Sequence, residues 1–494
     1  MNYQSTRDLS EKKYSAAQII KQGLAEDGGL FVPESIPTLT HNEIDALCSM
    51  SYPERAATIL SKYLSDYTYD ELLCDCKTVY SEEGFPGGAA PLRNVNDNIY
   101  SLELWHGPTA AFKDMALQIM PRLLSRALTK TGEDRTALIL VATSGDTGKA
   151  ALEGYKDVDK IKIMVFYPVD GVSRVQKLQM ATQTGSNVNV CAIEGNFDDA
   201  QTGVKVIFSD RDAAEKMNEK GYFFSSANSI NWGRLAPQIV YYVSAYCDLI
   251  NEGKIQMGDK INVCVPTGNF GNIFAAYLSK LMGLPIDKFI CASNRNNVLT
   301  EFLNTGTYNR NRKFHCTMSP SMDILISSNL ERLLYFCAGA EKTAAYMKQL
   351  NTEGAYTVAP EVLATISENF KGYYADEEMT AATIKDYFKN HSYLSDTHTA
   401  VALSCAHQYI SDTGDKTPMV VASTASPYKF AADVLKSITG NTPTDALKAL
   451  EILSEISGTE ISYPLRNLAE RRVRFTTTIK HENMLDEVFA FIEK

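Results

Sequence analysis

Short apolar runs alternate with helix-like segments through the middle of the chain. The runs TALILVAT (136–143), KIKIMVFYP (160–168) and NVNVCAIEG (187–195) are rich in β-branched residues, as buried strands are. The segments KAALEGYK (149–156) and RVQKLQMATQ (174–183), which lie between them, are typical of helices. This alternation predicts parallel strands joined by right-handed helical crossovers.

The same pattern returns in the second half of the chain. Strands are expected at KINVCVP (260–266), KFICASN (288–294) and PMVVAST (418–424), and helices at IFAAYLSKLMG (273–283) and FAADVLKSIT (430–439). In open α/β sheets, ligands bind beyond the carboxyl ends of the strands. Three loops in such positions are therefore expected to share one site. They are residues 144–148, 267–272 and 423–428.

The first part of the chain has a different character. Residues 1–95 are expected to form helices broken by Gly and Pro, and the turn-rich stretch FPGGAAPLRNVNDN (85–98) marks a domain boundary. The expected architecture is α/β, with two open parallel-sheet α/β domains and a mainly helical N-terminal domain. The expected domains are 1–95, a smaller α/β domain at 96–235 and a larger one at 236–494.

Composition narrows the classes of partner. The 494 residues are 45% hydrophobic and 22% charged, as in an ordinary globular protein with a large core. A formal net charge of -11 argues against binding to nucleic acid or to anionic membranes. No run of about 18 apolar residues and no apolar N-terminal segment occurs, so neither a membrane span nor a secretory signal is expected.

The 10 cysteines lie mostly in apolar stretches, which is typical of reduced thiols in a cytoplasmic protein. The one close pair, Cys74 and Cys76, lacks a second pair or a nearby histidine, so no metal site is expected. We expect a cytoplasmic protein that is a monomer or a weak homodimer.

Lys113, in the stretch WHGPTAAFKDMALQ (105–118), has apolar neighbours. An amine in an apolar pocket has a lowered pKa, and a neutral amine forms a Schiff base with a carbonyl. The alternative is a lysine whose stem packs while its head reaches water.

Two of the loops have the residues of anion sites at helix starts. PTGNFGN (266–272) fits a single phosphate monoester and lacks the patterns of nucleotide loops; the alternative is an ordinary tight turn. TSGDTGKAA (143–151) offers the hydroxyls of Thr143, Ser144 and Thr147 to a carboxylate or phosphate. There, Asp146 or Thr147 could instead cap a helix.

Three further polar loops precede expected helices. In ASTASPYKF (422–430) the hydroxyls of Ser423, Thr424 and Ser426 cluster, and each could simply satisfy loop backbone. The other two loops, NSINWGR (228–234) and SDTHTAVA (395–402), have helix caps and a surface arginine as the alternative. Their polar candidates are Asn228, Asn231, Arg234, Asp396 and His398.

One cofactor accounts for the lysine and the loops together. A Schiff-base lysine needs a bound aldehyde, and pyridoxal phosphate is the usual one. Its single phosphate suits residues 267–272, its ring nitrogen could pair with a hydroxyl in 423–426, and a substrate carboxylate would bind at 144–148.

The motifs resemble those of threonine synthases, in the family's order and over nearly the whole chain. The resemblance implies fold type II of the pyridoxal phosphate enzymes and conversion of O-phospho-L-homoserine and water into L-threonine and phosphate. The N-terminal motif and SPSMDI are similar to the branch found in yeast and many bacteria. The motifs are GLAEDGGLFVPESIP, HGPTAAFKD, ATSGDTGKAAL, NSINW, PTGNFGNIFAAYLSKLMGLP, SPSMDILISSNLERLLY and SDTHTAVA.

The resemblance implies a role for particular residues. Lys113 would be the Schiff-base lysine, and Thr424 would face the pyridine nitrogen. Ser426 stands where the family often has histidine, and Asn272 stands where some relatives have aspartate. The cofactor phosphate would be held by Gly268, Asn269, Phe270 and Asn272.

The substrate ligands follow from the need to hold a phosphate dianion in an acidic protein. We expect Ser144, Asn231 and Arg234 to bind the substrate phosphate ahead of Lys149. Thr143 and Thr147 are expected at the substrate carboxylate. Two alternatives remain: a phospho-amino-acid lyase that yields a 2-oxo acid, ammonia and phosphate, and a non-catalytic cofactor-binding protein. The role of His106 is left open.

Overall fold

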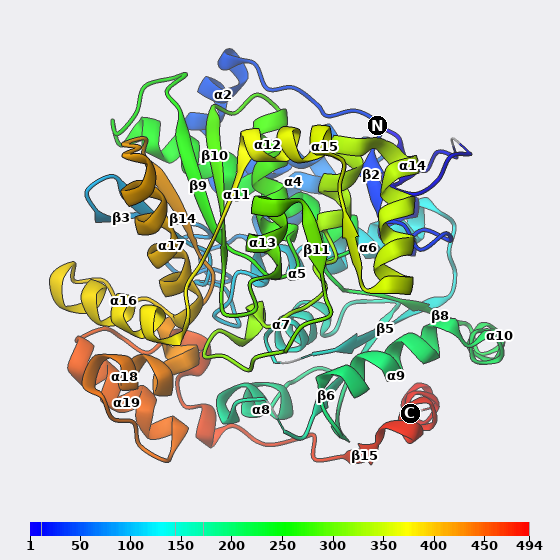
Figure 1. The fold of residues 1–494 in the computed structure, drawn as a ribbon. Helices are drawn as coiled ribbons and strands as arrows, with labels where there is room; N and C mark the ends of the chain where they lie inside the picture. The colour runs from blue at the N-terminus through cyan, green and yellow to red at the C-terminus, as the bar shows by residue number, and fades with distance from the viewer. Residues whose placement is uncertain (11, 144, 171, 494) are drawn as a thin grey trace.

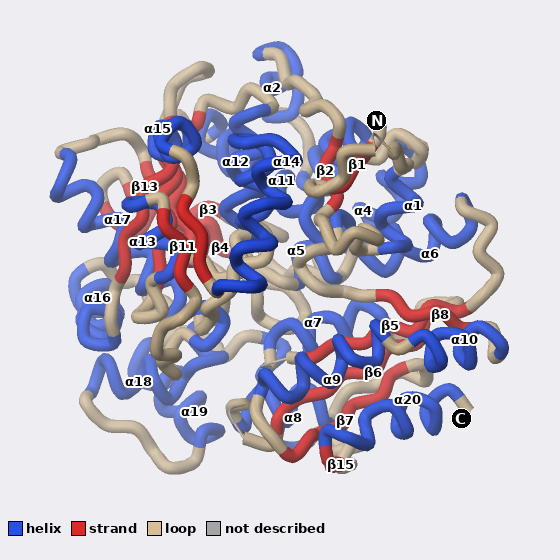
Figure 2. The backbone as a smooth tube through the Cα atoms, turned by 45° about the vertical axis from the view of Figure 1, so that its right-hand side comes forward, coloured by secondary structure: helices blue, strands red, loops and turns tan. Residues whose placement is uncertain are grey.

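Two separate β-sheets organise the protein. The structure is a computed structural model of residues 1–494 that describes all of them except residues 11, 144, 171 and 494 and the side chain of residue 198. Helices surround both sheets (Figure 1), and Figure 2 shows the strands of the two large sheets in two distinct groups, with β1 and β2 apart from both. No helix in the described part of the chain is both long and apolar enough to cross a bilayer.

The first sheet has six strands in the order β13-β10-β9-β14-β4-β3. All neighbours are parallel except β3, which runs antiparallel to β4. Its central strands β9 and β14 are buried along their whole length, as apolar runs covered on both faces should be. The strands are β3 (Leu92–Asn96), β4 (Ile99–Glu103), β9 (Ile261–Pro266), β10 (Ile286–Ser293), β13 (Phe370–Tyr374) and β14 (Met419–Ser423).

The second sheet has five parallel strands in the order β15-β7-β6-β5-β8. Alternate residues of β5 face opposite sides, because side chains alternate across a strand. Ile139 packs in the cluster that holds α7 (Asp146–Tyr155), whereas Leu140 packs with α9 (Phe197–Ser209) and α20 (Met484–Ile492). The strands are β5 (Thr136–Ala142), β6 (Ile161–Pro168), β7 (Val188–Glu194), β8 (Tyr222–Ser225) and β15 (Thr478–Lys480).

The N-terminal part is mainly helical and contains one small sheet, in which β1 (Tyr3–Ser5) pairs with β2 (Phe31–Pro33). Ser and Thr N-caps that form capping boxes begin its helices. The helices are α1 (Ala16–Gln22), α2 (His41–Cys48), α3 (Tyr52–Tyr63) and α4 (Tyr69–Val79).

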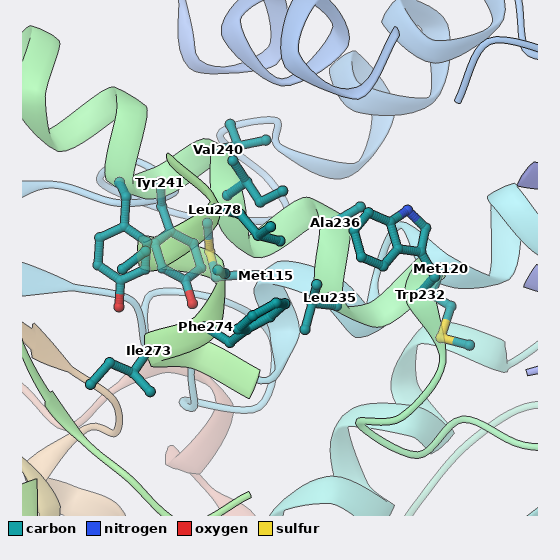
Figure 3. Packing of buried hydrophobic residues seen from close by; sticks show 14 of the residues in the cluster. Met115, Met120, Trp232, Leu235, Ala236, Val240, Tyr241, Ile273, Phe274 and Leu278 are labelled. Atoms are coloured by element: carbon teal, nitrogen blue, oxygen red, sulfur yellow. The ribbon is translucent and has the colours of Figure 1, made fainter. Parts of the chain in front are cut away.

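The helix α11 (Trp232–Asn251) is almost entirely buried and packs against α2, α3, α5 (Asp114–Leu117) and α12 (Gly271–Leu281). Figure 3 shows its side chains from Trp232 to Tyr241 among methionines 115 and 120 and the apolar face of α12. The N-terminal part and the six-stranded sheet therefore share one core around α11.

The remaining elements cover the two sheets or connect them. They are α5 (Asp114–Leu117), α6 (Met120–Lys130), α7 (Asp146–Tyr155), α8 (Arg174–Ala181), α9 (Phe197–Ser209), α10 (Arg211–Glu219), α12 (Gly271–Leu281), α13 (Val298–Thr305), β11 (Thr307–Asn309), α14 (Leu330–Glu353), β12 (Ala355–Thr357), α15 (Pro360–Asn369), α16 (Glu377–Asn390), α17 (Thr397–Thr413), α18 (Ala431–Thr439), α19 (Ala446–Ser457) and α20 (Met484–Ile492).

All six strands expected from the apolar runs are present. The two sheets nevertheless take strands from across the expected domain boundaries. Strand β4, within 96–235, pairs with β14, and β15, within 236–494, pairs with β7. The division of the chain at those boundaries stays a prediction.

Candidate active site

The candidate site lies where loops at the carboxyl ends of parallel strands meet. Lys113 follows β4, residues 267–270 follow β9, and residues 424–426 follow β14, all in the six-stranded sheet. The loop before α7 follows β5 of the other sheet. The contacts described below bring the three expected loops together around Lys113.

Lys113 is a buried amine, 9% exposed, at the start of α5. Its Nζ lies 3.4 Å from Asp146 Oδ2 and 3.3 Å from Ser321 Oγ. Burial lowers the pKa of Lys113; Asp146 opposes this shift, and the charges of Lys429 and Arg234 add to it. The head of the lysine contacts protein groups, so the structure favours a buried amine over one that reaches water.

Asp114 fixes the turn that precedes the lysine. Its carboxylate accepts hydrogen bonds from the backbone N–H (2.8 Å) and the hydroxyl (2.7 Å) of Thr109, and Ala110 adopts a left-handed φ of 61°. The N–H of Phe112 donates to the carbonyl of Thr424 (2.8 Å). Asp114 therefore shapes the turn, and the turn ties Lys113 to the loop after β14.

Asp146 is a buried carboxylate between two lysines. Its Oδ1 lies 2.8 Å from Lys429 Nζ and accepts a hydrogen bond from Gln176 (2.8 Å), while Oδ2 faces Lys113. Burial opposes ionisation, but the charges of Lys429 and Lys113 outweigh it and hold the pKa of Asp146 well below its usual range. The sequence did not single out Lys429 or Gln176, because both come from other elements.

At the start of α7 the structure does not support the alternative that Asp146 or Thr147 is a helix cap. Gly145, with φ of 133°, occupies the N-cap position and makes no side-chain cap bond, so neither Asp146 nor Thr147 caps the helix. Thr143 Oγ1 accepts two backbone N–H groups of the loop, each at 2.9 Å. Thr143 therefore holds the loop in shape. Ser144, expected here as a substrate ligand, lies outside the described residues.

The loop before α12 presents free backbone donors. In the described chain, no acceptor faces the N–H groups of Gly268, Asn269 and Phe270, and Phe270 is left-handed with φ of 61°. A Cβ on Gly268 would lie 2.8 Å from the carbonyl oxygen of Ser321, so only glycine fits. With the dipole of α12 behind them, these groups form a cradle for an anion.

Asn272 points an unused donor from the first turn of α12. Its Oδ1 accepts hydrogen bonds from the hydroxyls of Tyr241 (2.8 Å) and Tyr242. Its Nδ2 is buried and has no partner among the described residues. An orphaned buried donor beside an anion cradle fits the phosphate of pyridoxal phosphate, because a buried donor without an acceptor is costly.

The loop after β14, which accepts the backbone N–H of Phe112 next to the lysine, also provides hydroxyls. Thr424 is buried, and its hydroxyl has no hydrogen-bond partner in the described part of the protein. Ser426, where the family often has histidine, bonds Ser462 (2.5 Å) instead. Ser423 accepts a hydrogen bond from the Trp105 indole (3.0 Å). Of the three hydroxyls, the one on Thr424 is therefore left for a ligand.

Arg234 is a buried guanidinium on the first turn of α11, 6% exposed. It donates to the carbonyl of Ala227 (3.0 Å), and no carboxylate pairs with it among the described residues. Burial lowers its pKa to about 10. A buried, unpaired guanidinium is a ready ligand for an anion.

Asn231 is used differently. It caps α11 and donates to the carbonyl of Ile20 (3.0 Å), so the structure favours the capping alternative. Lys149 is paired with Glu153 (2.9 Å). Thr147 is partly buried, and its hydroxyl has no partner in the described residues. Among these expected substrate ligands, Thr147 remains available.

His106 and His398 both bond carboxylates. His106 lies 2.9 Å from Glu103 and stacks on its neighbouring tryptophan, away from the contacts of Lys113. His398 Nδ1 lies 3.0 Å from Asp396, and its Nε2 accepts the backbone N–H of Ser321 (3.1 Å). The sequence contained the motif of Ser321, but nothing in it showed that this serine reaches the lysine.

Three families match the chain in succession. Residues 2–80 match "Threonine synthase N terminus", residues 88–424 match "Pyridoxal-phosphate dependent enzyme", and residues 399–492 match "Threonine synthase, C-terminal". The second match alone covers more than half of the chain.

Individual relatives agree with these families. The chain is 41% identical over 443 residues to threonine synthase-like 1 of Macaca fascicularis. The aligned region covers 87% of this chain and 58% of that protein. It thus spans little more than half of that relative's length. Its identity to threonine synthase of Pseudomonas aeruginosa is 38% over 452 residues, with 90% of this chain and 92% of that protein covered.

A solved structure extends the similarity to the fold. The crystal structure of threonine synthase with bound pyridoxal phosphate from Brucella melitensis has a TM-score of 0.88 at 35% identity, covering 100% of this chain and 98% of that one. The expected fold type II and the expected cofactor are confirmed. The chain belongs to the threonine synthase family of pyridoxal-phosphate-dependent enzymes.

Proposed function

We propose that the protein is a threonine synthase, which converts O-phospho-L-homoserine and water into L-threonine and phosphate. One observation supports this proposal above the others. The buried lysine lies near an unpaired buried guanidinium, Arg234, which belongs to α11 and not to the cradle at the start of α12. One cradle suits the phosphate of the cofactor, so the second cation suits a substrate that carries its own phosphate.

The residues around the cradle would hold the cofactor. The backbone donors of Gly268, Asn269 and Phe270 and the side chain of Asn272 would bind its phosphate, and Lys113 would bind its aldehyde carbon. When bound, pyridoxal phosphate supplies an electron-withdrawing ring that acidifies C–H bonds of the attached amino acid. Thr424 would offer the ring nitrogen a neutral hydroxyl, which makes the ring a weaker electron sink than an aspartate would.

The chain's own residues would then move the protons. Lys113, whose pKa is lowered by burial, would take the proton from the substrate Cα and later from Cβ. Arg234 holds the phosphate that leaves from Cγ. Thr147, at the start of α7, would bind the substrate carboxylate with its hydroxyl and the nearby helix N-terminus. Burial of these groups keeps water from competing for the proton.

A cytoplasmic location and a monomeric or weakly dimeric state are also part of the proposal. The cysteines are free thiols, most of them buried or partly buried, as in proteins of a reducing compartment.

The decisive experiment is to incubate the purified, cofactor-loaded protein with O-phosphohomoserine and to quantify every product. We expect threonine and phosphate in equal amounts. A 2-oxo acid with ammonia would identify the phospho-amino-acid lyase instead. The Lys113→Ala variant should lose both the near-visible absorbance of the bound cofactor and the activity. A loaded protein that releases no phosphate would contradict the proposal.

A further inference from the structure

Ser321 lies on a short 3-10 turn (Pro320–Met322) in the segment SPSMDI, for which the proposed reaction has so far given no role. Its Oγ is 3.3 Å from Lys113 Nζ and 3.1 Å from Asp146 Oδ2. Its backbone N–H donates to His398. The hydroxyl of Ser321 therefore lies at the reacting amine, and His398 holds the backbone of Ser321 in place.

In the neutral form that attacks a carbonyl, the amine of Lys113 has an acceptor for each of its two hydrogens. Such an amine has two N–H donors and one lone pair. Ser321 Oγ at 3.3 Å and Asp146 Oδ2 at 3.4 Å are the two acceptors. With both N–H groups directed at these acceptors, the lone pair must take the remaining direction. That electron pair is what the amine uses to attack a carbonyl or to accept a proton.

His398 holds the serine in place. It is 3% exposed, and its Nδ1 lies 3.0 Å from the buried Asp396. Because Nε2 accepts the backbone N–H of Ser321, the ring proton belongs on Nδ1, next to the carboxylate. The histidine acts here as a hydrogen-bond acceptor for the turn and does not contact the amine.

The other side of the turn is also fixed. Asp323 accepts hydrogen bonds from the side-chain amides of Asn294 (2.8 Å) and Asn296 (2.9 Å) and from the hydroxyl of Thr317 (2.7 Å). A turn held from both sides loses little further entropy when its hydroxyl is used.

We propose that Ser321 is a further catalytic residue, whose hydroxyl directs the lone pair of Lys113, and that His398 is the positioning residue that holds Ser321. This inference rests on pyridoxal phosphate as the cofactor and Lys113 as its lysine. It does not depend on which amino acid the enzyme uses.

The step concerned is the attachment of the cofactor to the lysine. The lone pair of Nζ attacks the aldehyde carbon, a C=N bond replaces the C=O bond, and the carbonyl oxygen leaves as water with the two protons of the amine. The two N–H groups of Lys113 that donate hydrogen bonds to Ser321 and Asp146 are the ones that lose their protons in this step. Removal of the serine hydroxyl leaves the amine free to rotate and so makes the attack slower.

The first test follows attachment without any substrate. Full-length protein freed of cofactor is mixed with pyridoxal phosphate, and the near-visible band is recorded over time. Ser321→Ala should form the band about tenfold more slowly, and Ser321→Thr, which keeps the hydroxyl, should be close to wild type. Ser209→Ala is the matched control, because that exposed hydroxyl bonds only the carbonyls of Lys205 and Val206.

The second test uses the loaded enzyme and a double-mutant cycle. Ser321→Ala and His398→Ala should each lower kcat by about tenfold and leave KM within about twofold. The double variant should be no slower than Ser321→Ala alone, because His398 acts only through the serine. If His398→Ala does not fold, His398→Leu replaces it, because leucine fills the space of the ring but cannot accept the Ser321 N–H; His398→Gln, whose amide oxygen can accept it, should stay close to wild type.

The outcomes are separable. A wild-type rate of band formation in Ser321→Ala would overturn the role of the serine, and multiplied losses in the double variant would overturn the role of His398. If the wild-type protein makes no threonine, the proposed function fails, but the band-formation rates still decide the role of Ser321.

Discussion

Arg234 and Asn272 are buried side chains whose donors exceed the acceptors that the protein gives them. Leaving a buried neutral donor unpaired costs about 1–3 kcal/mol, and a charged one costs more. Buried donors of this kind lower the stability of the fold unless a ligand supplies the missing acceptors. At the residue scale, the two side chains therefore define two anion positions, one at the start of α11 and one at the start of α12.

Substitution of Arg234 tests the substrate position directly. Arg234→Met should raise KM for O-phosphohomoserine by about 10- to 100-fold, because the substrate phosphate loses a charge-assisted hydrogen bond. The absorbance of the bound cofactor should not change. The substitution should not lower the melting temperature, because it removes an unpaired buried charge. Steady-state kinetics and calorimetry measure both.

A matched control is Arg135→Met, which removes an arginine that pairs with Glu133 (2.7 Å) and lies outside the proposed site. Its kinetics should match wild type. Unchanged kinetics in Arg234→Met would show that the substrate phosphate binds elsewhere.

At the scale of elements, the start of α14 joins strand β2 and two loops that are far apart in the sequence. The fully buried Arg332 donates to the carbonyls of Phe31 (3.0 Å) and Ile230 (2.6 Å) and to the side chain of Asn329. Asn329 in turn donates twice to the carbonyl of Asn269 (3.0 and 2.9 Å), in the phosphate cradle. Burial lowers the pKa of Arg332 to about 9, so its charge is held at a cost.

The variant Arg332→Lys should therefore loosen the cradle. Lysine keeps the charge but cannot make the three-way fork, so we expect the Kd for pyridoxal phosphate to rise about tenfold and stability to fall by about 2 kcal/mol. Absorbance titration and chemical unfolding give the two values.

Arg7→Lys serves as the control for this effect. Arg7 binds the neighbouring Glu331 through two nitrogens, both at 2.7 Å, but does not touch Asn329. It should lose some stability and keep its cofactor affinity. Equal cofactor affinity in Arg332→Lys and wild type would show that Arg332 does not support the phosphate cradle.

At the scale of the whole molecule, the two sheets position different parts of the proposed site. The proposed cofactor ligands follow β4, β9 and β14 of the six-stranded sheet. The proposed substrate ligands come from the loop after β5 of the five-stranded sheet and from α11. In this proposal the substrate, unlike the cofactor, binds residues that follow strands of the five-stranded sheet.

Hydrogen exchange separates the two binding events. Pyridoxal phosphate alone should slow exchange of the amides at 268–270 by about tenfold or more, because no acceptor faces these donors in the described part of the protein. An unreactive phosphonate analogue of the substrate, added next, should slow exchange at 145–149. Mass spectrometry of peptides from the full chain reports both. Protection at 145–149 by the cofactor alone would contradict this division.

Much of the fold follows from local patterns, since the six apolar runs became strands where they were expected. The pattern did not predict β8, β13 or β15, because YFFS, FKGYY and TIK are short and gain their hydrogen bonds from neighbours that are distant in sequence. Within the site, Asn231 and Arg234 looked equivalent as polar residues of one motif. Only their places in the first turn of α11 separate a cap from a free guanidinium.

The sequence by itself determined the alternation of strands and helices, the apolar setting of Lys113 and the small residues of the phosphate cradle. These properties are local, since they depend on side-chain size, polarity and spacing along a few residues. The tertiary structure alone decided that Lys429 and Ser321 reach the neighbourhood of Lys113, and that Asn272 keeps a free donor. Contacts of this kind depend on which sheet edges meet, and no spacing along the chain encodes that distance.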